Sequence, residues 1–284
     1  MNSTNKIRIV TWNCQGGPFN ECLTEITKLN PDIAVIQEIN RPDMQNKNCL
    51  WVCGKVPFKG VAIVTFNGYS LNQIPRNPKA SDVFVPVNIT GPIKFNLMAL
   101  WTQEEFKYVR SVVPALSTYY RDLITKPLVV LGDFNSDVNL DQKSFPRIYH
   151  DKMVEYCAKE FGLVSSYHKK MKMDYGSELH PTFYMNRNKD RSWHFDYCFV
   201  PDMWVIEKVT VGSYEEWAGV SDHCPLIVDL IIDDNGHETR TKIRKSSQER
   251  FCAEIIIIGN APLPEPVRQL LKSVEERNAN PRMK

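Results

Sequence analysis

A short apolar run that ends abruptly in polar residues constrains the fold of this chain most. The residues from Leu128 to Leu131 are aliphatic, and Gly132-Asp133-Phe134-Asn135 follows directly. An uninterrupted apolar run of this length is typical of a strand buried on both faces. In α/β folds, ligands bind at the edge where such strands end. The carboxylate and amide therefore indicate a binding site, although an Asp-Asn turn that closes a strand explains this motif equally well on its own.

Two strands near the start of the chain are also expected to end in polar groups. Residues 7–13 end in Asn13 and residues 32–38 end in Glu38, with the apolar stripe of a helix over 21–29 between them. A strand–helix–strand unit brings both strand tips to one edge of a sheet. We therefore expect Asn13 and Glu38 to lie at the same edge as Asp133.

The rest of the chain up to residue 232 alternates expected strands with two expected helices. Short β-branched or aromatic segments predict strands at 50–53, 60–66, 83–89, 95–101, 182–184, 194–200, 205–211 and 221–230. Helical spacing predicts helices over 106–124, with a kink at Pro114, and over 153–161. Two of these strands carry Asp196 and the Asp222-His223 pair, which we interpret as further strand-end groups.

These polar groups suit the chemistry of phosphate esters. Glu38 and Asp222 are carboxylates of the kind that bind a hard divalent cation such as Mg²⁺. Asp133 is suited to activate a water that the Asn135 amide positions. His223 is suited to stabilise charge on a phosphoryl oxygen.

Asn13 and Asp196 are expected to orient these groups or to complete the ligands of the metal. Each motif has a plainer explanation when it is taken alone, because Glu38 can be a solvated strand end and Ser221-Asp222-His223 can be a turn. Asp196 is a stronger signal, since a carboxylate inside an apolar strand needs a polar partner. The repetition of one pattern along the chain favours a single site.

Six short motifs, in this order, resemble the endonuclease/exonuclease/phosphatase superfamily. They are Thr11-Trp12-Asn13, Gln37-Glu38, Gly60-Val61-Ala62, Gly132-Asp133-Phe134-Asn135, Phe195-Asp196-Tyr197 and Ser221-Asp222-His223. The resemblance covers about residues 6–232. It implies the deoxyribonuclease-I-like fold, an α/β (α+β) four-layer sandwich of two central mixed β-sheets flanked by helices.

The resemblance also implies the role of each site residue. It implies metal binding by Asn13 and Glu38, and catalysis by Asp133, Asn135, Asp196 and His223, while Asp222 is the further metal ligand expected from its carboxylate. Asp222 would also orient His223 against the phosphate. The implied cofactor is Mg²⁺, with Mn²⁺ as a possible substitute.

The sequence departs from the family pattern at two positions. Deoxyribonuclease and phosphatase members commonly have a histidine at the end of the strand that here finishes in Trp101. Abasic-site endonucleases lack that histidine too, but their usual Gln-Glu-Thr is here Gln37-Glu38-Ile39. The attacking side of the expected site is therefore complete, whereas the leaving-group side is not assigned.

A basic loop before Asp196 is the main indication of the substrate. It carries Arg187, Lys189 and Arg191 close to Trp193. Basic side chains interleaved with aromatic ones suit a phosphate backbone and unstacked bases, although a solvated hairpin loop would have a similar composition. We predict substrate binding by Arg187, Lys189, Arg191 and Trp101.

Charge is unevenly distributed along the chain and leaves more than one function open. The formal net charge is +2, but residues 235–284 carry a surplus of +4, so the preceding part carries −2. Such a part lacks the electrostatic footprint of a protein that coats nucleic acid, yet it allows a nuclease with local contacts. The leading hypothesis is a Mg²⁺-dependent phosphodiesterase, a nuclease that hydrolyses DNA or RNA by in-line attack of water. The alternatives are a phosphatase or phosphodiesterase acting on a small metabolite, nucleotide or lipid headgroup, and a silent binding module.

We expect a catalytic domain over 1–234 and an appendage over 235–284. The appendage reads as a basic linker, a β-prone stretch at 254–260 and a short helix at 267–276. Its four consecutive isoleucines need cover, so the tail is expected to contact the main domain, another subunit or a partner. The polar start of the chain, the scattered cysteines and the lack of a long apolar run favour a cytoplasmic protein without membrane contact.

Overall fold

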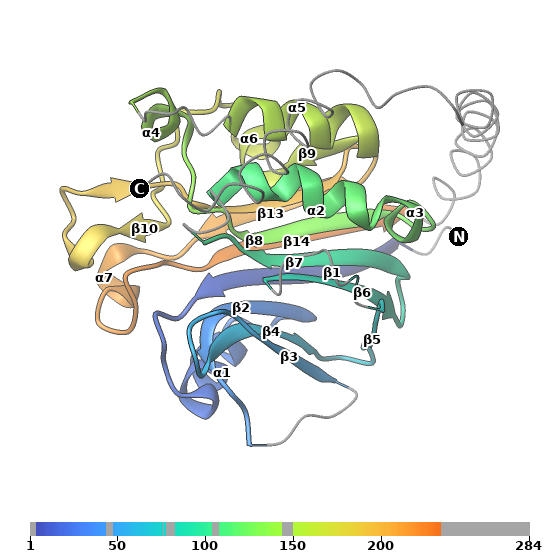
Figure 1. The fold of residues 1–284 in the computed structure, drawn as a ribbon, viewed down its shortest axis with the longest axis horizontal. Coiled ribbons are helices and arrows are strands. Elements are labelled where there is room, and N and C mark those ends of the chain that lie inside the picture. The colour runs from blue at the N-terminus through green and yellow to red at the C-terminus, as the bar shows by residue number, and fades with distance from the viewer. Residues whose placement is uncertain are drawn as a thin grey trace, which may run out of the picture. The chain divides into compact units, whose positions relative to one another are not determined.

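The computed structural model describes residues 4–43, 48–75, 77, 83–103, 108–143 and 150–233. Within these residues the chain forms two six-stranded sheets and a two-stranded hairpin (Figure 1). In spatial order the first sheet contains β13 (Val205–Val211), β14 (Leu226–Asp233), β1 (Thr4–Asn13), β2 (Ile33–Asn40), β4 (Lys59–Thr65) and β3 (Cys49–Cys53). The second contains β5 (Ser70–Gln73), β6 (Phe84–Thr90), β7 (Phe95–Trp101), β8 (Leu128–Asp133), β12 (Asp196–Pro201) and β9 (Leu163–Ser165). The hairpin consists of β10 (Phe183–Tyr184) and β11 (Ser192–Trp193).

Both sheets are mixed, and helices cover their outer faces. The β1–β2 and β7–β8 pairs are parallel, and the other pairs are antiparallel. Helix α1 (Phe19–Thr27) packs on the first sheet, whereas α2 (Val112–Thr118) and α5 (His150–Phe161) lie on the side of the second sheet (Figure 1). The remaining helices are α3 (Tyr120–Leu123), α4 (Val138–Lys143), α6 (Ser166–Met171) and α7 (Tyr214–Trp217). This arrangement confirms the expected four-layer sandwich.

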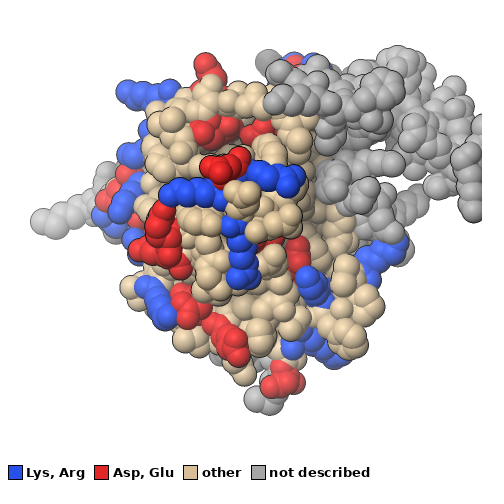
Figure 2. All heavy atoms as spheres, turned by 90° about the vertical axis from the view of Figure 1, so that its left-hand side faces the viewer, with Lys and Arg blue, Asp and Glu red and all other residues tan. Residues whose placement is uncertain are grey.

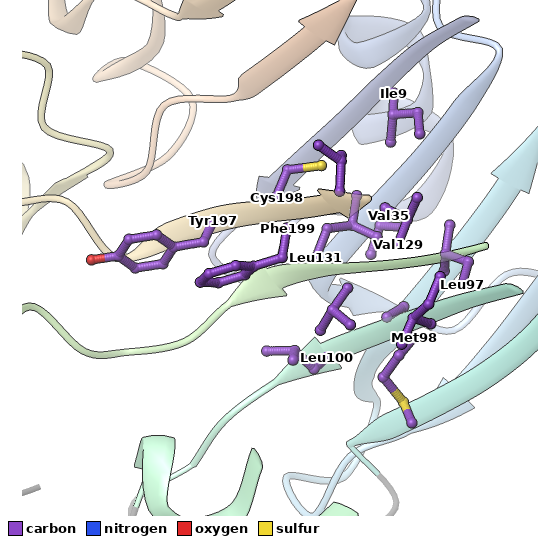
Figure 3. Packing of buried hydrophobic residues seen from close by; sticks show 14 of the residues in the cluster. Ile9, Val35, Leu97, Met98, Leu100, Val129, Leu131, Tyr197, Cys198 and Phe199 are labelled. Atoms are coloured by element: carbon purple, nitrogen blue, oxygen red, sulfur yellow. The ribbon is translucent and has the colours of Figure 1, made fainter. Parts of the chain in front are cut away.

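The central strands are apolar throughout because both of their faces are buried. Along β1, Ile9 faces the core between the sheets, whereas Val10 faces the core beneath α1. Along β2, Val35 likewise faces the core between the sheets, and Ala34 faces the core beneath α1. This alternation follows from the two-residue period of a strand. Figure 3 shows Val35 from β2 and Val129 from β8 among the side chains that fill the interior between the sheets.

Most of the expected elements are present, but the expected helix over 106–124 is interrupted. Within its described part, a 3₁₀ helix η2 (Tyr108–Ser111) leads into α2, and the chain then breaks at Tyr119 before α3. The expected kink at Pro114 is wrong. Pro114 lies in the first turn of α2, where a backbone N–H has no partner within the helix and its loss costs little.

Two expected strands begin later than predicted. Strand β12 begins at Asp196, and β14 begins at Leu226, so Asp222 and His223 precede their strand instead of belonging to it. The short elements β5, β9, β11, α4, α6, α7 and the 3₁₀ helix η3 (Met185–Arg187) were not predicted. The expected appendage at 235–284 lies outside the described residues.

Two further features bear on the sequence-based expectations. No helix in the described residues is long and apolar enough to cross a membrane. The seven cysteines within that same part of the chain are all free thiols.

Candidate active site

The predicted site residues meet at one end of the two sheets. Asn13 ends β1, and Glu38 lies near the end of its parallel neighbour β2. In the second sheet, Asp133 ends β8 and pairs in register with Asp196 at the start of β12. Because β8 and β12 are antiparallel, the start of β12 lies at the same edge as the end of β8. A hydrogen bond from Asn13 Nδ2 to Asp133 Oδ2, at 3.0 Å, joins the two sheets at this point.

Asp133 is fully buried and held by amide groups. Its Oδ2 also accepts a hydrogen bond from Asn135 Nδ2 at 3.0 Å, and its Oδ1 accepts one from the backbone N–H of Asn135 at 2.8 Å. Asn135 has a left-handed backbone with φ 45°, which an asparagine tolerates better than most residues. Its Nδ2 also donates to the carbonyl of Thr102 at 3.0 Å. The predicted Asp133 and Asn135 thus form one rigid unit.

Gly132 allows β8 to pass close to β7 immediately before this unit. Its φ is +144°, and a Cβ atom at this position would lie 1.9 Å from the carbonyl oxygen of Leu100. No side chain fits in that space. The glycine therefore fixes the path of the backbone that presents Asp133.

His223 lies between two buried carboxylates. Its Nδ1 is 2.8 Å from Asp196 Oδ2, and its Nε2 is 3.9 Å from Asp133 Oδ2. The expected orientation of His223 by Asp222 is therefore wrong, because Asp196 provides the hydrogen bond. The sequence could not reveal this pairing, since it depends on how β12 and the segment before β14 meet in space.

The cluster shifts the ionisation of its members. Burial alone would lower the pKa of His223, but the negative charges of Asp196 and Asp133 outweigh burial and raise it. Burial raises the pKa of Asp133, the positive charge of His223 opposes that rise, and Asp196 adds to it. His223 is consequently held in its charged form at neutral pH, and Asp133 is a stronger base than an ordinary carboxylate.

The segment that carries His223 is anchored to β1. Trp12 Nε1 donates to the carbonyl of His223 at 3.0 Å. Ser221 Oγ donates to the carbonyl of Asn13 at 2.8 Å and accepts from the backbone N–H of His223 at 3.0 Å. The Ser-Asp-His motif therefore needs its serine to hold the histidine in place.

Glu38 is aimed into the site by an irregularity in β2. The register between β2 and β4 shifts between Ile36 and Ile39, and Glu38 has a left-handed φ of 56°. Such bulges redirect side chains, and a strained backbone of this kind is common at functional sites. Glu38 Oε1 accepts from Asn13 Nδ2 at 3.2 Å, and Oε2 accepts from Lys59 Nζ at 2.8 Å.

Asp222 contacts a glutamine that the sequence did not reveal as a site residue. Its Oδ2 accepts from Gln15 Nε2 at 2.7 Å. Gln15 Oε1 in turn accepts from Arg187 Nη2 at 2.7 Å and from Arg187 Nε at 3.1 Å. Burial raises the pKa of Asp222, His223 opposes that rise, and the nearby charge of Glu38 adds to it. Asp222 therefore lies within electrostatic reach of Glu38, as two ligands of one cation would.

The donors at this edge fit a hard divalent cation in part. Glu38 and Asp222 offer the carboxylate oxygens that Mg²⁺ prefers. Asn13 fits the metal role less well, because its Oδ1 accepts the backbone N–H of Gln15 at 2.9 Å and its Nδ2 faces Glu38 and Asp133.

A second group with the geometry of a metal site is the buried cluster described above. The ligand atoms of Asp133, Asp196 and His223 all lie within 4.8 Å of one another. A metal-binding histidine must be neutral, and the negative charges of Asp196 and Asp133 raise the pKa of His223, so a metal that bound here would have to displace its proton. The chemistry of the donors therefore favours Glu38 and Asp222 for the cation and the buried cluster for proton transfer.

The basic loop lies near the site, but its charged groups are engaged. Arg187 also donates to the carbonyl of Gly219 at 3.1 Å, and Lys189 forms an ion pair with Glu215. Arg191 contacts the sulfur of Met185. Figure 2, which faces the side of the molecule that carries β10 and α7, shows basic and acidic side chains interspersed instead of a continuous basic surface.

Trp101 lies in the core instead of projecting into open space. It pairs in register with Asp133 across β7 and β8, but its exposed fraction is only 5%. Its indole ring packs so close to Gly54 that a Cβ atom there would lie 2.9 Å from Cζ3. Little of the indole is therefore available to a substrate, and substrate binding by Trp101 stays a prediction that this burial does not favour.

Aromatic rings line the side of the site next to His223. Phe183 stacks on Phe195 with ring centroids 4.9 Å apart and an interplanar angle of 12°. Trp193 extends the stack on the hairpin, 6.1 Å from Phe183. The ring of Phe183 is 4.7 Å from that of His223. A flat apolar surface thus adjoins the charged cluster.

Sequence reasoning missed three residues of this site, namely Gln15, Lys59 and Phe183. Two of them lie next to recognised motifs, since Gln15 follows Asn13 by two positions and Lys59 immediately precedes Gly60-Val61-Ala62. Their position beside these motifs is the sequence signal that could have identified them as site residues. Their partners, however, come from other strands.

Comparison with family models identifies the family. The model of the Endonuclease/Exonuclease/phosphatase family matches residues 10–223, a span that begins before Asn13 and ends at His223. The chain belongs to this family. Its members are hydrolytic phosphoesterases, nucleases among them. A search of the curated proteins finds no significant match.

Solved structures share the fold at low sequence identity. The endonuclease domain of TRAS1, a telomere-specific non-LTR retrotransposon, is 18% identical with a TM-score of 0.60, over 80% of this chain and 98% of that chain. The AP endonuclease LMAP from Leishmania major is 13% identical with a TM-score of 0.61, over 79% and 87%. The 3'-5' exonuclease NExo from Neisseria meningitidis is 21% identical with a TM-score of 0.57, over 78% and 98%. These likenesses establish the deoxyribonuclease-I-like fold and not the substrate.

Proposed function

We propose that this member of the endonuclease/exonuclease/phosphatase family is a Mg²⁺-dependent nuclease that hydrolyses phosphodiester bonds of DNA or RNA. The observation that carries the proposal is the Asp196–His223–Asp133 cluster beside the Glu38–Asp222 pair. A base, a cationic acid and two hard carboxylate ligands at one edge are the parts that hydrolysis of a phosphate ester needs.

Asp133 acts as the general base in the proposed mechanism. Its oxygen lies 3.9 Å from His223 Nε2, a separation that one oxygen atom can bridge by hydrogen bonds to both groups. Asp133 removes the proton of the attacking water, and Asn13 and Asn135 hold the carboxylate through their amide groups. His223, kept charged by Asp196, donates to a phosphoryl oxygen as negative charge develops there.

Glu38 and Asp222 are the residues that would hold the divalent cation. When bound, the cation supplies Lewis-acid stabilisation of the phosphoryl oxygens. Asn13 connects the two halves of the site, because its Nδ2 contacts both Glu38 and Asp133. The indole of Trp101 has no acidic group to protonate the leaving oxygen.

The aromatic side of the site supports a nucleic acid substrate. The half-buried rings of Phe183 and Trp193 offer flat surface to an unstacked base or sugar beside the charged cluster, and the buried ring of Phe195 supports Phe183 by stacking on it. Arg187 and Arg191 lie in the segment that joins β10 to β11, and their guanidinium groups are suited to contact a phosphate backbone. The structural neighbours named above include an endonuclease domain and an exonuclease, which agrees with this substrate class.

A specific observation favours a second candidate, a phosphatase or phosphodiesterase acting on a small phosphorylated molecule. Lys189 is already paired with Glu215, and Arg187 is held by Gln15. Basic and acidic side chains are interspersed on this face, whereas a long polyanion favours a continuous basic surface (Figure 2). Against a silent binding module stands the burial of Asp133 and Asp196, which destabilises a fold that gains no activity from them.

The test is a turnover assay with the full chain, in the presence of Mg²⁺ or Mn²⁺ and after chelation. The substrates are single-stranded and double-stranded DNA, RNA, an abasic duplex and a set of phosphorylated metabolites. We expect metal-dependent cleavage of a nucleic acid, with losses on the order of a thousandfold in Asp133→Asn and His223→Ala. Turnover of metabolites alone would select the second candidate, and no turnover of any substrate would exclude both enzymes.

A further inference from the structure

The ammonium group of Lys59 forms an ion pair with Glu38, one of the two carboxylates that we assign to the metal. Lys59 begins β4, opposite the bulge of β2, and its Nζ lies 2.8 Å from Glu38 Oε2. The side chains of Lys59 and Glu38 are 32% and 23% exposed, so solvent screens this ion pair only in part. No sequence motif indicates this contact.

The loop after β1 is built around the end of this lysine. Gly16 has a φ of +85°, and a Cβ atom there would lie 2.7 Å from Lys59 Cε and 2.9 Å from Nζ. A larger residue there would require the end of the Lys59 side chain to shift. The same loop carries Gln15, which holds Asp222. Lys59 therefore has a defined place in the site and is not a surface lysine that happens to meet an acid.

We propose that Lys59 is a resident cation that neutralises Glu38 in the metal-free protein and lowers the affinity of the site for a divalent metal. This inference rests on the proposed function, because it takes Glu38 as a metal ligand. Glu38 and Asp222 repel each other when both are charged, and the ammonium offsets that repulsion while the metal is away. A divalent metal that binds Glu38 has to displace the ammonium from the carboxylate.

Lys59 also helps to keep Glu38 aimed at the site. The backbone of Glu38 is held in a left-handed conformation, and its two carboxylate oxygens accept one hydrogen bond each, from Asn13 and from Lys59. Without Lys59, one oxygen of the carboxylate loses its partner. The two effects are separable, because loss of orientation weakens metal binding whereas loss of the competing charge strengthens it. We expect removal of the competing charge to have the larger effect, so that loss of Lys59 strengthens metal binding.

The first test measures Mn²⁺ binding to the full chain by electron paramagnetic resonance of the free ion and by calorimetry. Lys59→Met removes the charge and keeps the length of the side chain. We expect it to bind Mn²⁺ roughly tenfold more tightly or better, because the repulsion between two cations on one carboxylate is removed. Lys59→Arg should stay within about threefold of the wild type, because its charge is retained. Lys28→Met is the matched control: it removes another lysine paired with a glutamate, since Lys28 at the C-cap of α1 lies 2.6 Å from Glu25.

Unchanged or weaker Mn²⁺ binding in Lys59→Met would overturn the inference, even if the enzyme remained metal-dependent and the proposed function stood. In the Glu38→Gln background, the effect of Lys59→Met should disappear, and a persisting effect would contradict a local competition. If Mn²⁺ does not bind the wild type or Lys59→Met, and no substrate is turned over, then the proposed function fails together with the inference.

The second test uses the unmodified chain and does not depend on the folding of any variant. An amine-reactive reagent labels accessible lysines, and mass spectrometry reports the extent of labelling at each position. We expect Mg²⁺ to increase labelling of Lys59 several-fold while labelling of Lys28 stays the same. Equal labelling of Lys59 with and without saturating Mg²⁺ would contradict displacement of the ammonium.

Discussion

The ionisation of His223 depends on the charges of its neighbours. Burial alone would favour a neutral imidazole, and the two carboxylates reverse that preference. Asp196 contributes both charge and a hydrogen bond at 2.8 Å, whereas Asp133 lies farther away, at 3.9 Å. The protonation state of His223 is therefore controlled mainly by Asp196.

Replacement of Asp196 by Asn tests this dependence through the pH profile. The raised pKa of His223 in the wild type places the basic limb of kcat/KM above the ordinary histidine value of about 6.5. Asp196→Asn removes one negative charge, so the limb should move to lower pH and activity at pH 8 should fall roughly a hundredfold. A basic limb that stays in place would show that Asp196 does not keep His223 charged.

Asp133 should define the acidic limb of the same profile. Its pKa is raised chiefly by burial, so the limb is expected above the ordinary aspartate value of about 3.9. Asp133 is useful as a base only when it is deprotonated, and activity should therefore rise as pH increases through this limb. The measurement is kcat/KM in the wild type between pH 4 and 7, and a limb at the ordinary aspartate value would contradict the assignment.

At the scale of the elements, the approach of β8 to β7 depends on Gly132. Gly132→Ala would place a Cβ atom 1.9 Å from the Leu100 carbonyl, where the neighbouring atom is backbone and cannot move alone. We expect the free energy of unfolding to fall by about 3 kcal/mol or more, or the protein to fail to fold. Gly219→Ala is the control, because a Cβ atom there meets nothing within 4 Å. Urea denaturation compares the two variants, and similar stabilities would contradict the close packing.

His194, in the segment between β11 and β12, is expected to make the free energy of unfolding depend on pH. Burial lowers the pKa of His194 to about 4, although its hydrogen bond to the His180 carbonyl opposes that shift. Because this pKa lies below the unfolded value of about 6.5, the unfolded chain binds more protons between these pH values. The stability contributed by neutral His194 is complete above pH 6.5 and is lost as pH falls towards 4.

We expect this loss to be on the order of 2 kcal/mol between pH 7.5 and 5. In His194→Asn, which lacks the titrating group, that part of the pH dependence should vanish, even if the variant is less stable overall. Urea denaturation at the two pH values measures both proteins. Equal pH dependence in the two would show that His194 is not the titrating group.

The elements themselves were largely predictable from sequence, because burial on both faces leaves long apolar runs. Strands such as β7 and β8 have no exposed face, and their ends coincide with the first polar or conformationally special residues. The interruption at Tyr119 was not predictable, since residues on both sides of it keep helical spacing. The bulge at Glu38 was not predictable either, because it arises from the pairing of β2 with β4.

At the scale of the whole molecule, the site depends on contacts between segments distant in sequence. The identities of Asp133, Asp196 and His223 were evident from their motifs. Their pairing was not evident, because it requires the antiparallel register of β8 with β12 and the anchoring of His223 by Trp12. The same holds for Gln15 and Lys59, whose partners lie on other strands.

The mixed charge of the face that carries β10 and α7 predicts a weak dependence of nucleic acid binding on salt. Basic and acidic side chains alternate there and Lys189 is paired with Glu215, so we expect log Kd for a DNA oligonucleotide to change with log salt as if about two or three phosphates were neutralised. Arg187→Ala should reduce that slope by about one if Arg187 leaves Gln15 to contact a phosphate. Fluorescence anisotropy between 50 and 300 mM salt, with catalysis blocked by Asp133→Asn, measures the slope. A slope several times steeper would indicate a basic surface elsewhere on the chain.

The central claim is that Asp133 activates a water that attacks phosphorus. The most direct measurement is cleavage of an oligonucleotide in ¹⁸O-labelled water with Mg²⁺, followed by mass spectrometry of the products. We expect one ¹⁸O atom in the product phosphate and a rate at least a hundredfold lower in Asp133→Asn, with the same label position. A product phosphate without ¹⁸O, or an unchanged rate in Asp133→Asn, would contradict it.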